Sequence, residues 1–316
     1  MRITNTSMIR NHMYDTQQNL TRMNKINEEI SSGKVINKVS DDPHKAIRIM
    51  NLNNEIKYTE KYNYNIDETV GWMNTTDGSL EHLGNVLGDI KKDILKIGNG
   101  TYSDDELKAI KAETNEKLKE IADVMNTTYA GKYMFGGTNV DEPPITMDEK
   151  DGVVTLKLNP NSNTNDLRAD ISDGINIDYN VSVGEIFNNL DSNGNPVNFF
   201  EELNNVSQLM NKIISGNDTE KNVAKEQLLG STKSNIDKLY SHALDERTSL
   251  GVRVSTAEKI KELNEENVLN MKGVLSLDQD VDEVEAFIEL KTAELVYQAS
   301  IQVGTKLIQP TILDYL

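Results

Sequence analysis

The chain has 316 residues, of which 37% are hydrophobic, 5% aromatic and 27% charged, and it carries a net charge of −18. This composition excludes one large isotropic core and favours thin helical bundles with long exposed faces. The negative charge argues against nucleic acid and anionic membranes as partners, and the absence of cysteine excludes disulfides and thiolate chemistry. No apolar segment approaches the length of a membrane span, so we expect no membrane insertion.

Residues 1–40 are typical of an amphipathic helix with a net charge of +3. The helix is expected to end at Gly33, because glycine tolerates the left-handed conformation of a helix cap. Thr16 and Asn27 are polar members of a series with three- and four-residue spacing. Its apolar members are Ile9, Met13, Leu20, Met23 and Ile30.

Helices are also predicted for the next part of the chain. Asp42 and Pro43 are a capping residue and a first-turn proline, and they open a long helix that we expect to end at about Gly71. A second apolar stripe runs from Leu80 to Ile97 and stops at Gly98. Ser103 to Glu106 form a capping box, which starts a helix that ends near Gly131.

Residues 141–200 differ from both flanks, because they hold four of the six prolines and a net charge of −8. Residues 175–183 alternate strictly between apolar and polar, as in a strand with one buried face. Val154, Leu156 and Leu158 repeat the pattern more briefly. The window therefore reads as a small β-rich insertion, and helical patterns return after it.

The C-terminal segment, residues 278–316, is a second amphipathic helix with a net charge of −6. Its first apolar series is expected to pair with the N-terminal helix, and comprises Val281, Val284, Ile288, Leu295 and Ala299. A second stripe either packs on neighbouring subunits or belongs to a broad face within one chain, and comprises Phe287, Leu290, Tyr297, Ile301 and Ile308.

The predicted fold is mainly α: nested N- and C-terminal helices form a coiled coil and an elongated helical rod, with an inserted small β-rich domain. Three domains are expected. They are a terminal coiled coil (1–40 with 278–316), a helical rod (41–140 with 200–277) and an outer β-rich domain (141–199). The terminal segments lack partners in a monomer, so we expect them to be largely disordered until the protein assembles.

No catalytic constellation is evident. The four histidines are too scattered to form a metal site, and we expect no metal and no cofactor. Asp278, Asp280, Asp282 and Glu289 match four positions of a calcium loop. Glu283 stands where that loop needs glycine, so the segment is better interpreted as a helix whose first turn is acidic.

Three stretches, taken in order, resemble the flagellin superfamily of bacterial flagella. They are residues 30–43 (ISSGKVIN running into SDDP), residues 76–80 with 98–104, and the closing residues 313–316. The resemblance covers about residues 1–140 and 200–316. The opening residues 1–5, the proline after Asp42 and residues 132–138 are similar to the hook–filament junction branch rather than to filament flagellins.

The resemblance implies a structural protein without catalysis. Such proteins join the hook, through the first junction protein, to the flagellin filament by helical or ring polymerisation. It also implies a secreted protein of the flagellum that is exported without a cleaved signal peptide. An export chaperone is expected on the C-terminal helix. The alternatives are a filament flagellin or a general coiled-coil scaffold. An enzyme within the insertion has the least support, because no nucleophile or metal motif is present there.

Overall fold

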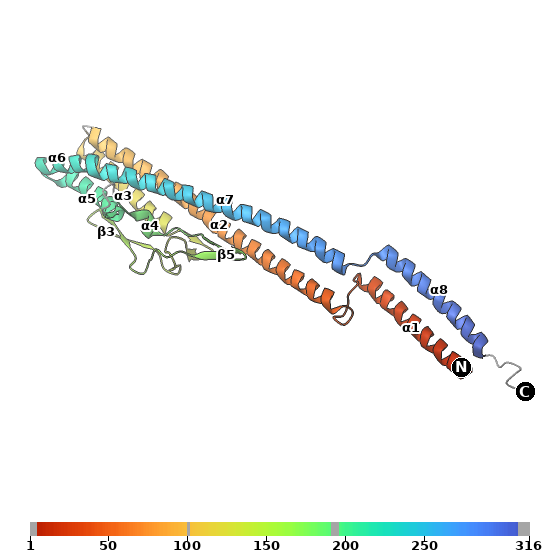
Figure 1. Ribbon diagram of the computed structural model, residues 1–316. Coiled ribbons are helices and arrows are strands. Elements are labelled where there is room, and N and C mark those ends of the chain that lie inside the picture. The colour runs from red at the N-terminus through yellow and green to blue at the C-terminus, as the bar shows by residue number, and fades with distance from the viewer. Residues whose placement is uncertain (1–4, 100–101, 191–195, 309–316) are drawn as a thin grey trace, which may run out of the picture. The chain divides into compact units, whose positions relative to one another are not determined.

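The computed structural model describes residues 5–99, 102–190 and 196–308, which belong to two compact units (Figure 1). Unit 1 combines residues 1–60 with 266–316, and unit 2 comprises residues 61–265. The helices are α1 (Asn5–Ser32), α2 (Pro43–Asn99), α3 (Asp104–Met125), α4 (Val183–Phe187), α5 (Phe199–Ser215), α6 (Asp218–Gln227), a π-helical turn (Leu228–Thr232), α7 (Lys233–Gln279) and α8 (Glu283–Ile308). Within the described ranges, no helix is long and apolar enough to cross a membrane.

The strands form antiparallel ribbons of two strands each. They are β1 (Thr128–Tyr129) with β2 (Lys132–Tyr133), β3 (Ile145–Lys150) with β4 (Val153–Leu158), β5 (Arg168–Ser172) with β6 (Ile175–Asp178), and β7 (Asn188–Leu190) with β8 (Pro196–Asn198).

Two of the predicted capping residues lie at the starts of helices, as expected. The Asp42 carboxylate accepts hydrogen bonds from the backbone N–H groups of His44 and Lys45 at 3.0 and 3.1 Å, and α2 begins at Pro43. Ser103 and Glu106 form the predicted capping box at the start of α3. These bonds satisfy N–H groups that have no partner inside the helix.

The predicted helix end near Gly71 is wrong, because α2 runs without interruption from Pro43 to Asn99. Gly71 marks a close approach to another residue. A Cβ atom at this position would lie 2.5 Å from the phenolic oxygen of Tyr129. The glycine therefore serves tertiary packing and does not end the helix.

The core of unit 2 gathers the apolar faces of α2, α3, α5 and α7 with the inner side chains of the ribbons. The predicted stripe of α2 is buried throughout, at Leu80, Leu83, Leu87, Ile90, Ile94 and Ile97. Ion pairs join α2 and α7 beside this core. The Arg247 guanidinium contacts Asp77 and Glu81 at 2.9 and 3.1 Å, and Lys261 contacts Asp67 at 2.7 Å.

Side chains on the helices hold the ribbons by their strand edges. Asn204 of α5 accepts a hydrogen bond from the Leu156 N–H at 2.7 Å and donates one to the Leu156 carbonyl at 3.0 Å. Asn264 of α7 donates to the Ile171 carbonyl at 2.9 Å, and Asn65 of α2 donates to the Asp170 carbonyl at 3.0 Å. These amides take the place of a neighbouring strand, so these edge groups are paired without a larger sheet.

The strand predicted for residues 175–183 is shorter than expected. It ends at Asp178 as β6, and α4 begins at Val183. Ser182 and Glu185 form a capping box at this start, and that local signal overrides the alternation of the preceding residues.

The predicted fold class is confirmed: the chain is mainly helical, with nested terminal helices and an inserted β-rich segment. The predicted division into three domains stays a prediction. The boundaries of the two units fall inside α2 and α7, near residues 60 and 265.

Candidate assembly surface

In unit 1, α1 and α8 lie side by side and run in opposite directions (Figure 1). The Val281 N–H donates to the Gly33 carbonyl at 3.1 Å. Further along, Arg22 lies 3.5 Å from Glu289, and the hydroxyls of Thr16 and Ser300 are 2.8 Å apart. Residue numbers thus rise along one helix as they fall along the other, which defines an antiparallel pair.

The less exposed positions of both helices recur at alternating three- and four-residue intervals, the repeat of a coiled coil. We call these positions the seam. On α1 they are Ile9, His12, Thr16, Asn19, Met23, Ile26 and Ile30; on α8 they are Ala286, Leu290, Ala293, Tyr297, Ser300 and Gly304. Among them, Ile26, Ala286 and Gly304 are buried and the rest are half-buried.

Small and polar residues occupy much of the seam. Ala286, Ala293 and Ser300 follow one another at seven-residue intervals on α8. A Cβ atom added to Gly304 would lie 2.5 Å from Nε2 of His12. The two helices therefore approach closely but bury little apolar surface, and apolar burial is the main source of packing free energy.

Part of the predicted pairing is wrong. Val284, Ile288 and Leu295 are 71, 60 and 67% exposed, and Ala299 is exposed as well. A helix turns by about 100° per residue, which places these four side chains on the side of α8 away from the seam. We call them the outer ridge. Val281 precedes α8 and is half-buried.

The second predicted stripe of α8 is divided between two environments. Leu290 and Tyr297 are seam residues, whereas Phe287 and Ile301 are 54 and 45% exposed. The side chain of Ile308 lies outside the described residues, as does the closing segment 313–316. That Phe287, Ile301 and Ile308 contact neighbouring subunits therefore stays a prediction.

On α1, Ile9, Met23 and Ile30 of the predicted series lie at the seam, whereas Met13 and Leu20 are exposed. Together with Tyr297 and Ile301 they line a groove of about 490 Å³ between the two helices. His12, Thr16 and Gly304 also line this groove. It is open and largely apolar.

The family-like segment at residues 30–43 has a structural role at one end of the α1–α8 pair. Gly33 adopts φ = 71°, as predicted for a helix cap, and Lys34 forms an isolated β-bridge with Asp280. The Arg48 guanidinium contacts the Asp278 carboxylate at 3.1 Å. The Lys34 bridge joins the loop after α1 to the break between α7 and α8, and the Arg48 contact joins α2 to the end of α7.

The acidic segment at residues 278–289 forms a helix junction. Asp280 lies in the bridge to Lys34, and Asp282 accepts hydrogen bonds from the N–H groups of Val284 and Glu285 at 3.0 and 3.1 Å. Helix α8 thus begins at Glu283 with Asp282 as its cap, later than the sequence suggested. Nowhere in the described chain do three or more His, Asp or Glu side chains come together as metal ligands.

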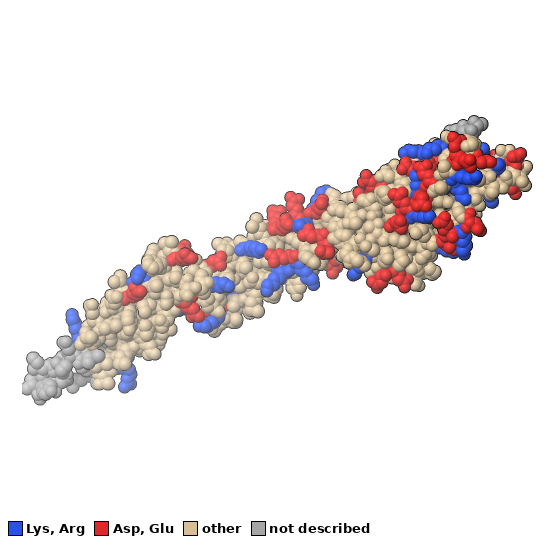
Figure 2. Space-filling model, turned by 180° about the vertical axis from the view of Figure 1, so that it is seen from behind, with Lys and Arg blue, Asp and Glu red and all other residues tan. Residues whose placement is uncertain are grey.

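Figure 2 shows one face of α1 and α8, next to the grey terminal residues, on which charged side chains are sparse. The Glu28 carboxylate, hydrogen-bonded to Lys38, raises the pKa of that ammonium group. The exposed side chains of these two helices include the apolar ones of Met13, Leu20, Val284 and Leu295, and exposed apolar patches are typical of interaction sites.

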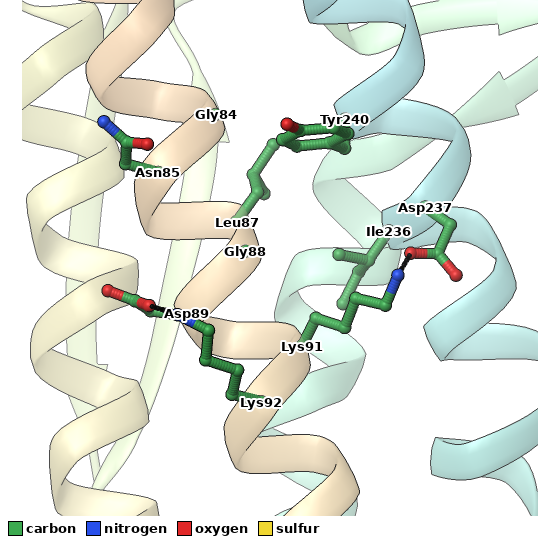
Figure 3. A pocket seen from close by; sticks show the side chains of 10 residues that line it. All are labelled: Gly84, Asn85, Leu87, Gly88, Asp89, Lys91, Lys92, Ile236, Asp237 and Tyr240. Atoms are coloured by element: carbon green, nitrogen blue, oxygen red, sulfur yellow. Dashed lines mark hydrogen bonds and ion pairs between the residues drawn. The ribbon is translucent and has the colours of Figure 1, made fainter.

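A second hollow, of about 510 Å³, lies between α2 and α7 within unit 2 (Figure 3). Its lining includes Gly84, Gly88 and Tyr240. Lysines at its rim already pair with carboxylates, Lys91 with Asp237 and Lys92 with Asp89 (Figure 3). This hollow presents paired charges and glycines.

Comparison with known proteins assigns this architecture. Residues 3–140 match the family model of the bacterial flagellin N-terminal helical region. Over 315 residues the chain is 21% identical to flagellar hook-associated protein 3 of Salmonella typhimurium, covering 97% of this chain and 95% of that protein. It is 28% identical to the flagellar filament 41 kDa core protein of Borreliella burgdorferi over 49% of this chain and 46% of that one.

A solved structure shares the fold. The crystal structure of flagellar hook-associated protein 3 from Legionella pneumophila superposes with a TM-score of 0.62 at 14% identity, covering 72% of this chain and 98% of that one. The chain is thus similar to bacterial flagellins in its N-terminal region and to hook-associated protein 3 over nearly its whole length.

Proposed function

We propose that this protein is a structural component of the bacterial flagellum that joins the hook to the filament through polymerisation of α1 and α8, without catalysis. The observation that carries the proposal is the distribution of apolar residues on α8. Only one side of this helix faces α1, yet Val284, Ile288 and Leu295 on the other side are more than half exposed. Apolar side chains on two opposite sides of one helix favour a second covering surface besides α1.

The similarity to hook-associated protein 3 supports a set of partners for this surface. Further subunits of the same chain, the first hook–filament junction protein and flagellin would cover the exposed sides of α1 and α8 in the assembled flagellum. Before export, a chaperone would cover the C-terminal helix. Its exposed apolar groups would otherwise favour aggregation. The protein acts outside the cell and leaves it without a cleaved signal peptide.

A deletion strain tests the proposed function. Cells lacking this protein are expected to assemble hooks but no attached filaments, and to release flagellin into the medium. Electron microscopy and a motility assay measure both outcomes, and a plasmid copy of the native gene is the control. Full motility of the deletion strain would contradict the proposal.

A filament flagellin is the main alternative. The similarity to hook-associated protein 3 extends over the β-rich insertion as well as both termini, whereas the similarity to the filament core protein covers about half of the chain. This difference favours the junction protein. A filament protein would extend seeds into long polymers, whereas a junction protein should stop at a ring or short oligomer.

A further inference from the structure

We propose that Lys111 and Asn211 form a covalent isopeptide bond between α3 and α5 of the folded chain. The Nζ atom of Lys111 lies 2.7 Å from Oδ1 of Asn211, although the two residues are 100 positions apart in the sequence. Both side chains are half-buried within unit 2. This cross-link goes beyond the proposed function and does not depend on it.

A neighbouring set of polar contacts fixes how α3 and α5 meet. One turn along each helix from the Lys111–Asn211 pair, the buried Ser207 hydroxyl donates to Oδ1 of Asn115 at 2.7 Å. The Asn115 amide donates to the Gly152 carbonyl, in the turn between β3 and β4, at 2.9 Å. The helices thus hold Lys111 and Asn211 in contact, and a fixed geometry raises the effective concentration of two reacting groups.

The surroundings of Lys111 favour the neutral amine, which is its nucleophilic form. Among the described residues, its hydrogen-bond partner is the uncharged amide of Asn211, and it forms no ion pair. The turn at Gly152 covers the amine, since a Cβ atom added there would lie 3.3 Å from Nζ. Burial lowers the pKa of the Lys111 ammonium group, although the Glu149 carboxylate acts in the opposite direction. The uncharged fraction of this amine at neutral pH is therefore larger than that of an exposed lysine.

The reaction needs no oxidant and no cofactor. The lone pair of the neutral Lys111 amine attacks Cγ of Asn211, and a C–N bond forms between Nζ and Cγ. The bond between Cγ and Nδ2 then breaks. One proton passes from the attacking nitrogen to the departing nitrogen, which leaves as ammonia. No atom is oxidised or reduced, and the product is an uncharged secondary amide.

Glu149 on β3 is the group placed to carry that proton. Its charge acts on Lys111, and its half-exposed carboxylate is held by the Lys119 ammonium group at 2.9 Å. Because Glu149 and Lys111 form no ion pair, a single water molecule between them would complete the path of the proton.

The bond would close a loop that contains all four β ribbons and α4. The chain has no cysteine, so a disulfide cannot close this loop. A cross-link across a long loop stabilises a fold mainly by restricting the unfolded chain. The β-rich segment would therefore stay attached to the helices of unit 2 even when that unit opens locally.

The intact mass of the full chain, measured under denaturing conditions after incubation of the folded protein, tests the inference. The cross-linked chain is expected to be lighter than its sequence by one molecule of ammonia. A protease digest should contain a branched peptide that joins Lys111 to Asn211. A chain kept in denaturant for the same time should retain its full mass, because its two groups are not held together. A folded chain that retains its full mass would overturn the inference.

Single variants separate this bond from other losses of ammonia. Lys111→Arg keeps the positive charge but supplies no neutral amine, and Asn211→Ala removes the group that is attacked, so both chains should retain their full mass. Lys108→Arg on the exposed side of α3 is the matched control and should lose ammonia as the native chain does. An asparagine before glycine, such as Asn99, also loses ammonia when it cyclises on its own backbone. A loss that persists in Lys111→Arg would indicate such a ring and would overturn the inference.

Glu149→Gln tests the proton carrier. We expect cross-linking in this variant to slow by at least about 10-fold, because a positioned acid–base group is lost while the two reacting side chains remain. Glu149→Asp keeps a carboxylate and should recover part of the rate. Circular dichroism verifies that both variants fold. A native rate in Glu149→Gln would overturn the role of Glu149.

Discussion

The two units of this protein use their apolar side chains in opposite ways. Unit 2 buries nearly the whole apolar stripe of α2 in a continuous core. In the described part of unit 1, the buried hydrophobic side chains are Ile26, Ala46, Ile56, Val268 and Ala286. Large exposed ones extend along all of its helices: Met8, Met13, Leu20, Ile47, Met50, Leu269, Leu277, Val284, Phe287, Ile288, Leu295 and Ile301. Unit 2 thus buries a core of its own, whereas unit 1 leaves large apolar side chains uncovered on all of its helices.

Hydrogen exchange of the purified monomer is expected to show the largest difference between the units. Amides of α1 and α8 should exchange within minutes, because opening them exposes little buried surface, and those of α2 near Leu87 should need near-global unfolding. Rapid exchange of α1 and α8 would agree with the prediction that the terminal segments become ordered only on assembly. Strong protection of both terminal helices in the monomer would contradict it.

Replacing one leucine of each unit by alanine compares how much a single apolar side chain contributes to the stability of that unit. Leu87→Ala removes a side chain that is 1% exposed and is expected to lower the free energy of unfolding by about 2–5 kcal/mol. Leu295→Ala alters a side chain on the outer ridge, and the monomer should lose less than about 0.5 kcal/mol. Denaturant titrations of the monomer measure both values. Equal losses would show that the ridge is buried within one chain.

Replacing either of two glycines of α2 by alanine should change the stability of unit 2 by a smaller amount, and in opposite directions for the two positions. Gly78 has no atom within 4 Å of an added Cβ, so Gly78→Ala should stabilise unit 2 by up to about 1 kcal/mol. Gly71→Ala should destabilise it, because Tyr129 would have to move. Thermal unfolding of the two variants compares them directly. A loss of stability in Gly78→Ala would reveal a contact at that position.

The pH dependence of unit 2 is expected to show the smallest effect. Burial raises the pKa of Glu246, although His242 and Arg253 nearby act in the opposite direction. The folded state therefore binds the Glu246 proton more tightly than the unfolded chain does. The buried carboxylate lowers the stability of unit 2 at pH values above the raised pKa, and this loss of stability disappears as the pH falls through that pKa. Glu246→Gln should therefore raise Tm slightly at pH 8 and have less effect near pH 4.

The difference between the units also explains what could be predicted from sequence. The stripe from Leu80 to Ile97 is apolar at each buried position, so its periodicity identified the core face of α2. At the α1–α8 seam, heptad positions hold His12, Thr16, Asn19, Ser300 and Gly304, whereas the strongest apolar series of α8 faces outward. Apolarity alone therefore selected the wrong face. The seven-residue spacing of Ala286, Ala293 and Ser300 was the signal that could have located the seam.

Tertiary contacts account for the other differences. The close approach of Gly71 to Tyr129 depends on residues 58 positions apart, and local sequence does not reveal it. The amide bonds from Asn65, Asn204 and Asn264 to the ribbons likewise join distant segments. Asparagine in a helix has no distinct periodic pattern, so these anchors were not predicted.

The asparagine anchors suggest where the molecule could accept foreign sequence. Two of them, Asn65 and Asn264, hold β5 through the Asp170 and Ile171 carbonyls, which precede the turn at Asp173 and Gly174. That turn is bonded to neither amide, and an added Cβ at Gly174 meets nothing within 4 Å. A peptide inserted between Asp173 and Gly174 would extend the tip while the anchored strand stays in register. The β5–β6 hairpin is thus a natural display site for epitopes or labels on the flagellum.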